Sequence, residues 1–216
     1  MKSLFARLLA LLLGLTASAE EPTLRLDAAA LHQRGEERFF AGRLKEAVAD
    51  WDREIALQPA RGPHHWQRGL CLYYLEAYDE GAAQFTTHQK VNGNDVENAA
   101  WHFICTVRGT GGSIAKAREQ LIPIEGDTRI PMKEIHRLYA GLARPDEVIA
   151  AAGKGADALQ RRNQLCYAHL YVGLYLEALG EKKKSKDHFQ KAAVDFKMDH
   201  YMGKVAQLHH QLRGEK

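Results

Sequence analysis

The chain of 216 residues is 45% hydrophobic, 26% charged and 8% aromatic. These ordinary values argue against a disordered, collagen-like or bulk membrane protein. The formal net charge is +3, but Lys2 and Arg7 lie in a segment that we expect to be removed, and without them 28 basic residues face 27 acidic ones. A nucleic-acid-binding protein usually carries a basic face and a high pI, so no nucleic-acid partner is expected.

The N-terminus has the layout of a secretory signal peptide. A basic start is followed by an apolar run over residues 8–16, and Ala17-Ser18-Ala19 offers small residues for cleavage before Glu20. Nine apolar residues are too few for a membrane-spanning helix, which takes about 20. We expect residues 1–19 to be cleaved and residues 20–216 to be exported to the periplasm or the extracellular space, with no transmembrane segment.

From residue 28 onward, the sequence repeats with a period near 34. Apolar residues recur at spacings of three and four, which predicts pairs of amphipathic helices joined by short turns. In each pair the first helix carries a small residue, and the second carries a small residue followed four positions later by an aromatic one. Two stretches align without a gap, placing Gly35 over Gly69, Leu44 over Tyr78, Ala47 over Gly81, Trp51 over Phe85 and Pro59 over Gly93.

Three further copies follow, and the pattern is loosest in the middle of the chain. Cys105 takes the first small position in the third copy, whereas Gly173 and Phe189 take the small and aromatic positions in the fifth. The sequence predicts no strands. The predicted helix pairs cover residues 28–61, 62–95, 98–128, 129–165 and 166–199, and one more helix covers 200–212.

This pattern resembles the tetratricopeptide repeat (TPR), whose pattern is W-x2-L-G-x2-Y, then A-x3-F, then P. The resemblance covers residues 28–199 and implies an all-α, right-handed superhelical solenoid with a C-terminal capping helix. The first-helix tyrosine is present only as Tyr139, and only the first copy ends in proline, at Pro59. The chain is also similar to exported bacterial TPR proteins, distantly to periplasmic TPR adaptor lipoproteins, although no lipid-attachment cysteine follows its apolar run.

The resemblance further implies a concave groove, lined by the first helices of the repeats, that takes a protein or peptide partner. Aromatic residues concentrate in its N-terminal half, and Tyr and Trp are preferred interface anchors. An aromatic residue at helical spacing more often belongs to the core, so a core role is the alternative for these residues. The candidate groove residues are His32, Glu36, Phe39, Phe40, Trp66, Leu70, Tyr73, Tyr74 and His102.

Eleven histidines raise the question of a metal site. Adjacent residues of a helix point about 100° apart, so the doublets His64-His65 and His209-His210 do not converge on one ion. No H-E-x-x-H or C-x-x-C motif is present. We therefore expect surface histidines, no metal or other cofactor, and no catalytic residue.

Three remaining features have structural interpretations. The cysteines Cys71, Cys105 and Cys166 are odd in number and lack C-x-x-C spacing, so we expect buried free thiols. The G-T-G-G-S run over residues 109–113 is expected to be a turn between helices. The lysines at residues 182–186 are expected to form a solvated helix face.

The sequence thus predicts an exported, non-enzymatic scaffold or adaptor that binds a protein or peptide partner in the concave groove. Whether it forms a homo-oligomer is left open. The alternative is an enzyme or metal-binding protein built on the same helical solenoid. Stoichiometric zinc, together with an activity that is lost on chelation, would favour the enzyme or metal-binding protein over the scaffold.

Overall fold

The computed structural model describes residues 26–214, so the expected signal peptide lies outside the described residues. Every regular element in this range is helical, with no strand, which confirms the all-α prediction. No described helix is both long enough and apolar enough to cross a membrane. The helices are α1 (Ala28–Phe40), α2 (Leu44–Leu57), η1 (Pro59–His64), α3 (Trp66–Tyr74), α4 (Tyr78–His88), α5 (Val96–Arg108), α6 (Ile114–Glu119), α7 (Met132–Tyr139), α8 (Pro145–Ala152), α9 (Ala158–Ala178), α10 (Lys182–Gln190), η2 (Lys191–Asp195) and α11 (Tyr201–Gly214).

Consecutive helices pack against each other as α1 with α2, α3 with α4, α5 with α6, α7 with α8, and α9 with α10. The packing depends on the small residues that the sequence pattern identified. A Cβ atom on Gly69 or Gly173 would lie 2.7 Å from the ring of Phe85 or Phe189, and Trp51 covers Gly35 in the same way. All three aromatic rings are buried. The small and aromatic positions of the repeat are therefore contact partners within one helix pair.

The central part of the chain is less regular than either end. Helix α6 has 6 residues, and no helix forms between it and α7 at Met132. Helix α9 has 21 residues and begins at Ala158, well before the predicted start near residue 166. Its N-terminus is fixed by Asp157, whose side chain accepts a hydrogen bond from the Gln160 amide over 2.8 Å. The fifth pair thus begins with a polar turn that the apolar pattern did not include.

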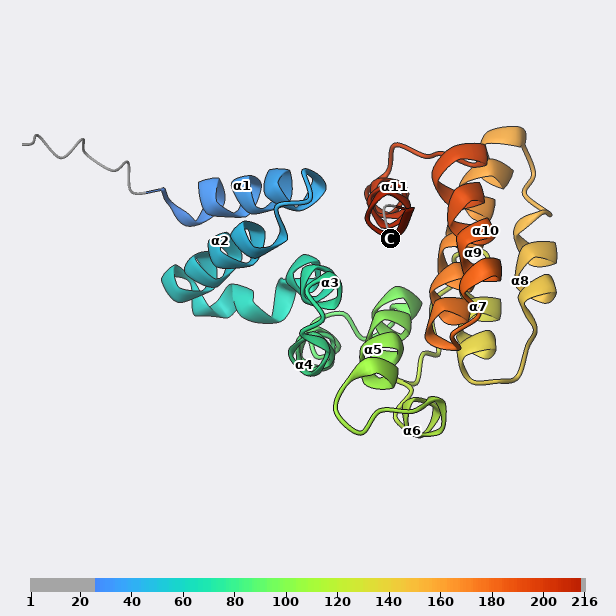
Figure 1. The fold of residues 1–216 in the computed structure, drawn as a ribbon, viewed down its shortest axis with the longest axis horizontal. Helices are drawn as coiled ribbons and strands as arrows, with labels where there is room; N and C mark the ends of the chain where they lie inside the picture. The colour runs from blue at the N-terminus through green and yellow to red at the C-terminus, as the bar shows by residue number, and fades with distance from the viewer. Residues whose placement is uncertain (1–25, 215–216) are drawn as a thin grey trace, which may run out of the picture.

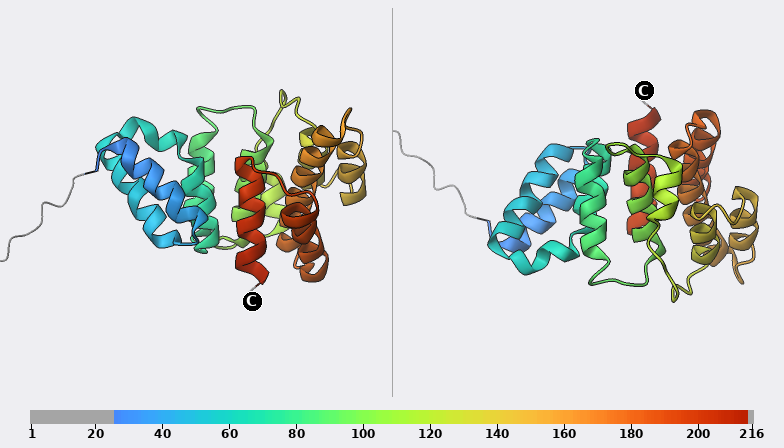
Figure 2. Two further views of the ribbon diagram at one scale, coloured as in Figure 1. Left: turned by 90° about the horizontal axis from the view of Figure 1, so that it is seen from above. Right: turned by 90° about the horizontal axis from the view of Figure 1, so that it is seen from below.

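Helix α11 lies on the inner side of an arc made by the other helices. Figure 1 looks along α11, with α1 and α3 on one side of it and α9 and α10 on the other. The views from above and below also place α11 between these two groups (Figure 2). Helix α11 packs against η2 and α10, as expected of a helix that follows the last pair, but it also contacts α9 and α1. It therefore joins the two ends of the arc.

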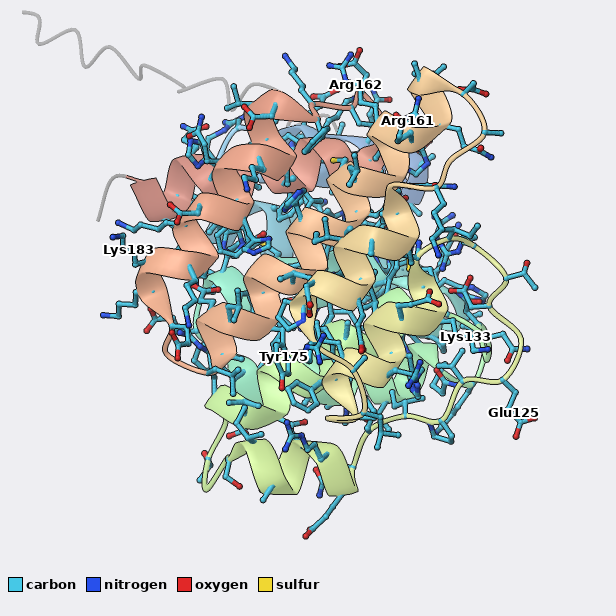
Figure 3. All side chains as sticks on the ribbon, turned by 90° about the vertical axis from the view of Figure 1, so that its right-hand side faces the viewer. Glu125, Lys133, Arg161, Arg162, Tyr175 and Lys183 are labelled. Carbon is cyan, nitrogen blue, oxygen red and sulfur yellow. The ribbon has the colours of Figure 1, made fainter. Side chains whose placement is uncertain are left out.

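Basic residues are exposed on α9 and α10. Arg161, Arg162 and Lys183 are exposed and project outward from α9 and α10 (Figure 3). Lys182, Lys184 and Lys186 are exposed as well, as predicted for a solvated helix face. The run over residues 109–113 connects α5 to α6, which confirms the predicted turn.

Candidate functional site

Helix α11 occupies the side of the molecule where the sequence predicted an open groove. Of the candidate groove residues, Phe39, Leu70, Tyr73, Tyr74 and His102 are all buried, with exposed fractions of 8% or less. The expectation that these side chains are open to a partner is therefore wrong. One physical reason is the chain's own last helix: Tyr74 packs against His209, and Arg213 lies over the ring of Tyr73. Phe39 is covered instead within its own helix pair, by Trp51, because burying aromatic surface is favourable.

At its N-terminal end, α11 makes aromatic contacts with the predicted groove. The ring of Tyr201 packs edge-on against Phe40, with centroids 4.9 Å apart, and against Trp66 at 4.7 Å. Both Phe40 and Trp66 are half-buried. Glu36 is also half-buried. The pKa of Tyr201 is raised mainly by the burial of its own side chain and then by the negative charge of Glu36. Three predicted groove residues therefore surround one residue of α11.

At its C-terminal end, α11 is held by Glu177 of α9. Tyr73 donates its hydroxyl hydrogen to Glu177 Oε2 over 2.8 Å, and Arg213 Nε lies 3.0 Å from Oε1. His209 Nε2 lies 3.4 Å from the same carboxylate, and its Nδ1 is 3.1 Å from the Tyr74 hydroxyl. Burial alone would raise the pKa of Glu177, but the contacts from His209, Arg213 and Tyr73 lower it to about 2. An ionised carboxylate thus connects α3, α9 and α11.

A cavity of about 260 Å³ lies beside the first turn of α11. The predicted groove residues Trp66 and Leu70 line it, together with Trp101 of α5 and Tyr201 of α11. The remaining predicted residue, His32, does not line the cavity. Its Nδ1 atom instead lies 3.0 Å from Glu54 Oε2 on α2. The structure thus brings together part of the predicted set and places the rest under α11 or elsewhere.

Three buried polar atoms on residues lining this cavity have no hydrogen-bond partner among the described atoms. They are the indole nitrogen of Trp101, the amide oxygen Oδ1 of Asn98 and the hydroxyl of Tyr201. Trp101 is 1% exposed and Asn98 is 3% exposed. Leaving a buried donor or acceptor unsatisfied costs about 1–3 kcal/mol, and such groups are rare in folded proteins. The residues of the cavity wall therefore carry one donor, one acceptor and one hydroxyl without a described protein partner.

One edge of the cavity is acidic. Asp95 and Glu97 line it, and Arg129 donates hydrogen bonds to both, over 2.7 and 2.6 Å, and to Asp127 over 2.6 Å. Glu97 also accepts a 2.6 Å hydrogen bond from the Tyr171 hydroxyl. Burial and the negative charge of Asp95 raise the pKa of Glu97 to about 7. The hydrogen bonds from Tyr171 and Arg129 act in the opposite direction but are outweighed. Three carboxyl groups share one guanidinium, so this edge favours a cationic or hydrogen-bond-donating ligand.

The sequence contained a signal for this cavity that the groove prediction did not use. Trp101 lies four positions after Glu97 and three after Asn98, so each of the two polar residues neighbours the tryptophan on the surface of α5. This part of α5 was expected to be apolar. An amide and a carboxylate next to the tryptophan indicate that it binds a polar group. Asp95 has a local role as well, since its side chain caps α5 by accepting from the Glu97 amide over 3.0 Å.

The histidines are less exposed than the sequence suggested. His65, His88, His102, His169 and His209 are all buried, so the prediction of surface histidines is wrong for these five. Helices from other parts of the chain cover them, which local spacing does not reveal. The ring of Phe189, for example, lies 3.9 Å from that of His209.

The cysteines agree with the prediction. Cys71, Cys105 and Cys166 all lie in the described range, and all are buried free thiols. Burial raises the pKa of Cys71 to about 12 and that of Cys166 to about 11. Because the thiolate is the reactive form, none of them is suited to nucleophilic chemistry.

Comparison with family models and with curated proteins gives no match to this chain. Its site is therefore interpreted from its own geometry.

Proposed function

We propose that this chain is an exported, non-enzymatic binding protein, a TPR-like solenoid of five helix pairs that captures a peptide segment of a protein partner beside α11. The observation that carries this proposal is the cavity, because it combines aromatic walls with three unsatisfied polar atoms. A preformed apolar pocket with a few converging polar groups is the usual form of a ligand site.

The polar groups of the cavity match the chemistry of a peptide backbone. A peptide unit carries one carbonyl acceptor and one N–H donor. The carbonyl would accept from the Trp101 indole, and the N–H would donate to Asn98 Oδ1. The rings of Trp66 and Tyr201 would cover the accompanying side chain, since such residues dominate the energy of interfaces. Asp95 and Glu97 at the edge would favour a basic side chain on the partner.

The repeat pattern supports the solenoid part of the proposal. Gly35, Gly69 and Gly173 each contact the aromatic residue that follows 16 positions later in the sequence, as a recurrent helix-pair unit requires. Helix α11 then has two roles: it covers the last pair, as terminal elements of repeat arrays do, and it occupies most of the concave face. The partner would bind in the part of that face that α11 leaves open, which is the cavity.

Selection of a random peptide library on the mature chain, residues 20–216, tests the binding proposal. The variant Tyr201→Phe removes only an unpartnered hydroxyl, and Trp101→Phe removes the unpartnered indole N–H while keeping an aromatic ring. Each lost hydrogen bond should weaken the selected peptides by about three- to tenfold. Leu142→Ala, on an exposed residue outside the cavity, should leave affinity unchanged. Peptides that bind Tyr201→Phe and Trp101→Phe as tightly as the wild type would place the binding site elsewhere.

Export is tested separately. N-terminal sequencing of the protein recovered outside the cytoplasm should begin at Glu20, because the apolar run and the Ala17-Ser18-Ala19 segment precede it. An intact Met1 on that protein would contradict cleavage.

A further inference from the structure

A second cluster of chemically active side chains lies away from the cavity, where the first helix pair meets the second. His32 comes from α1, Glu54 from α2, and His65 from the residue that precedes α3. His32 Nδ1 lies 3.0 Å from Glu54 Oε2, and His65 Nε2 lies 3.1 Å from the same oxygen. One potential ligand atom from each residue falls within 4.8 Å of the others.

The burial of this cluster is graded. Glu54 and His65 are 0% and 2% exposed, whereas the His32 side chain is 27% exposed. The interior of the cluster is therefore shielded, and His32 gives a small ion a path from solvent. A carboxylate buried this deeply requires charged or hydrogen-bonded partners.

His65 is the residue of the cluster whose polar atoms are least satisfied by their surroundings. Neither of its ring nitrogens makes a hydrogen bond with a described atom, because the 3.1 Å approach of Nε2 to Glu54 lacks the geometry of one. A neutral imidazole with a free lone pair is the form in which histidine binds metals.

Arg61 orients the carboxylate. Its Nε atom lies 2.5 Å from Glu54 Oε1, as a salt bridge that lacks hydrogen-bond geometry, while Oε2 lies near the two histidines. His32 is positioned in turn by Trp51, whose indole N–H donates to the His32 carbonyl oxygen over 3.3 Å. Trp51 thus fixes the backbone of His32, and a contact such as that of Arg61 is typical of a carboxylate that ligates a metal.

We propose that His32, Glu54 and His65 bind one divalent transition-metal ion of the zinc class. Zinc bonds of about 2.0–2.2 Å in a tetrahedral site separate ligand atoms by roughly 3.3–3.5 Å, and the two nitrogen–oxygen distances fall a few tenths of an ångström short of that. Two imidazoles and one carboxylate form a known zinc ligand set with an open fourth position. The ion would connect α1, α2 and α3 and so hold the first two helix pairs together. The sequence prediction missed this site because it examined adjacent histidines and short motifs, whereas these three residues are far apart in sequence.

Metal titration of the mature, untagged chain tests the proposal, because a polyhistidine tag would itself bind zinc. After chelator treatment, titration with Zn²⁺ should show one ion per chain, and Co²⁺ should give the visible absorption of a low-coordinate site. His32→Ala, which changes the most exposed ligand, should weaken Zn²⁺ binding at least tenfold, and Glu54→Gln should do the same. Zn²⁺ should also raise the unfolding temperature of the wild type more than that of His32→Ala.

Two control variants separate this site from other histidines. His64→Ala changes the exposed neighbour of His65 and should leave the affinity unchanged. His188→Ala removes the pair in which the Nδ1 atoms of His169 and His188 lie 2.8 Å apart, and it should also have no effect. Zinc binding that is absent from the wild type, or that survives in both His32→Ala and Glu54→Gln, would show the cluster to be a hydrogen-bonded group only. If Glu54→Gln does not fold, His32→Ala decides the question.

Discussion

Tyr73 and Glu177 are 104 positions apart in sequence, yet the phenol of the first donates a 2.8 Å hydrogen bond to the carboxylate of the second. Tyr73 belongs to α3 and is 0% exposed, whereas Glu177 belongs to α9 and also contacts Arg213 of α11. The hydrogen bond therefore joins the two sides of the arc next to α11. It therefore reports whether the concave face is closed.

Removing that hydrogen bond should cost stability. Tyr73→Phe deletes a hydrogen bond to a buried charge and should lower the free energy of unfolding by about 1.5–3 kcal/mol. Tyr73→Ala should lower it by about 3–5 kcal/mol, as much as Trp51→Ala, because both rings are fully buried. Urea denaturation followed by circular dichroism measures both. Tyr201→Phe is the matched control, since its hydroxyl has no described partner, and it should not lower stability. Equal stability of Tyr73→Phe and the wild type would mean that α11 does not hold this position in solution.

Removing α11 should uncover the aromatic surface beneath it. A chain that ends at Asp199 loses the buried residues of α11, which over the described positions are Met202, Gly203, Val205, Ala206, Leu208 and His209. Each large apolar side chain contributes about 1.5–3 kcal/mol through burial, so the truncated chain should unfold several degrees lower and bind a hydrophobic dye. A chain ending at Gly214 keeps the helix and should behave like the full one. Absence of dye binding and of any thermal change would contradict the closed arrangement.

Glu97 should make stability fall as the pH rises through neutrality. Its pKa in the folded protein is raised from 4.5 to about 7, so the folded state holds a proton that the unfolded state has already lost. The penalty therefore grows from pH 4.5 and is complete above pH 7, where it reaches about 3–3.5 kcal/mol. Glu97→Gln cannot titrate at this position and should remove that slope. Denaturation at pH 5, 6, 7 and 8 measures the difference, and a slope of opposite sign would show that Arg129 outweighs burial.

The sequence was sufficient for the features that recur. Gly69 and Phe85, like Gly173 and Phe189, are contact partners in the structure at the spacing that the repeat pattern indicated. Such pairs can be predicted because both members belong to one helix pair and the same spacing occurs several times. The early start of α9 is different, since it depends on Asp157 capping a polar turn that occurs only once.

The candidate site was predictable only in part. Trp66 and Leu70 do line a cavity, but nothing local indicated that Tyr201 and His209 would return from the end of the chain to cover their neighbours. The cluster of His32, Glu54 and His65 likewise forms only when two helix pairs stack. Contacts of this kind depend on how distant helix pairs are placed relative to one another, and helical periodicity does not determine that placement.

The turn between α3 and α4 provides a test of the local backbone. Glu76 has φ 63°, a left-handed conformation that costs a residue with a side chain about 1 kcal/mol or more. Gly42 occupies the same turn one repeat earlier, with φ 73°. Glu76→Gly should therefore raise the free energy of unfolding by about 0.5–1 kcal/mol, after the greater flexibility of glycine in the unfolded chain is deducted.

Gly42→Ala is the converse change and should lower stability by a similar amount. No atom lies within 4 Å of the Cβ that it adds, so any loss comes from the backbone conformation alone. Urea denaturation measures both variants, and the dependence on denaturant should stay unchanged because the buried surface does. If Glu76→Gly destabilised the protein while Gly42→Ala did as expected, side-chain contacts of Glu76 would have to outweigh the strain of its backbone.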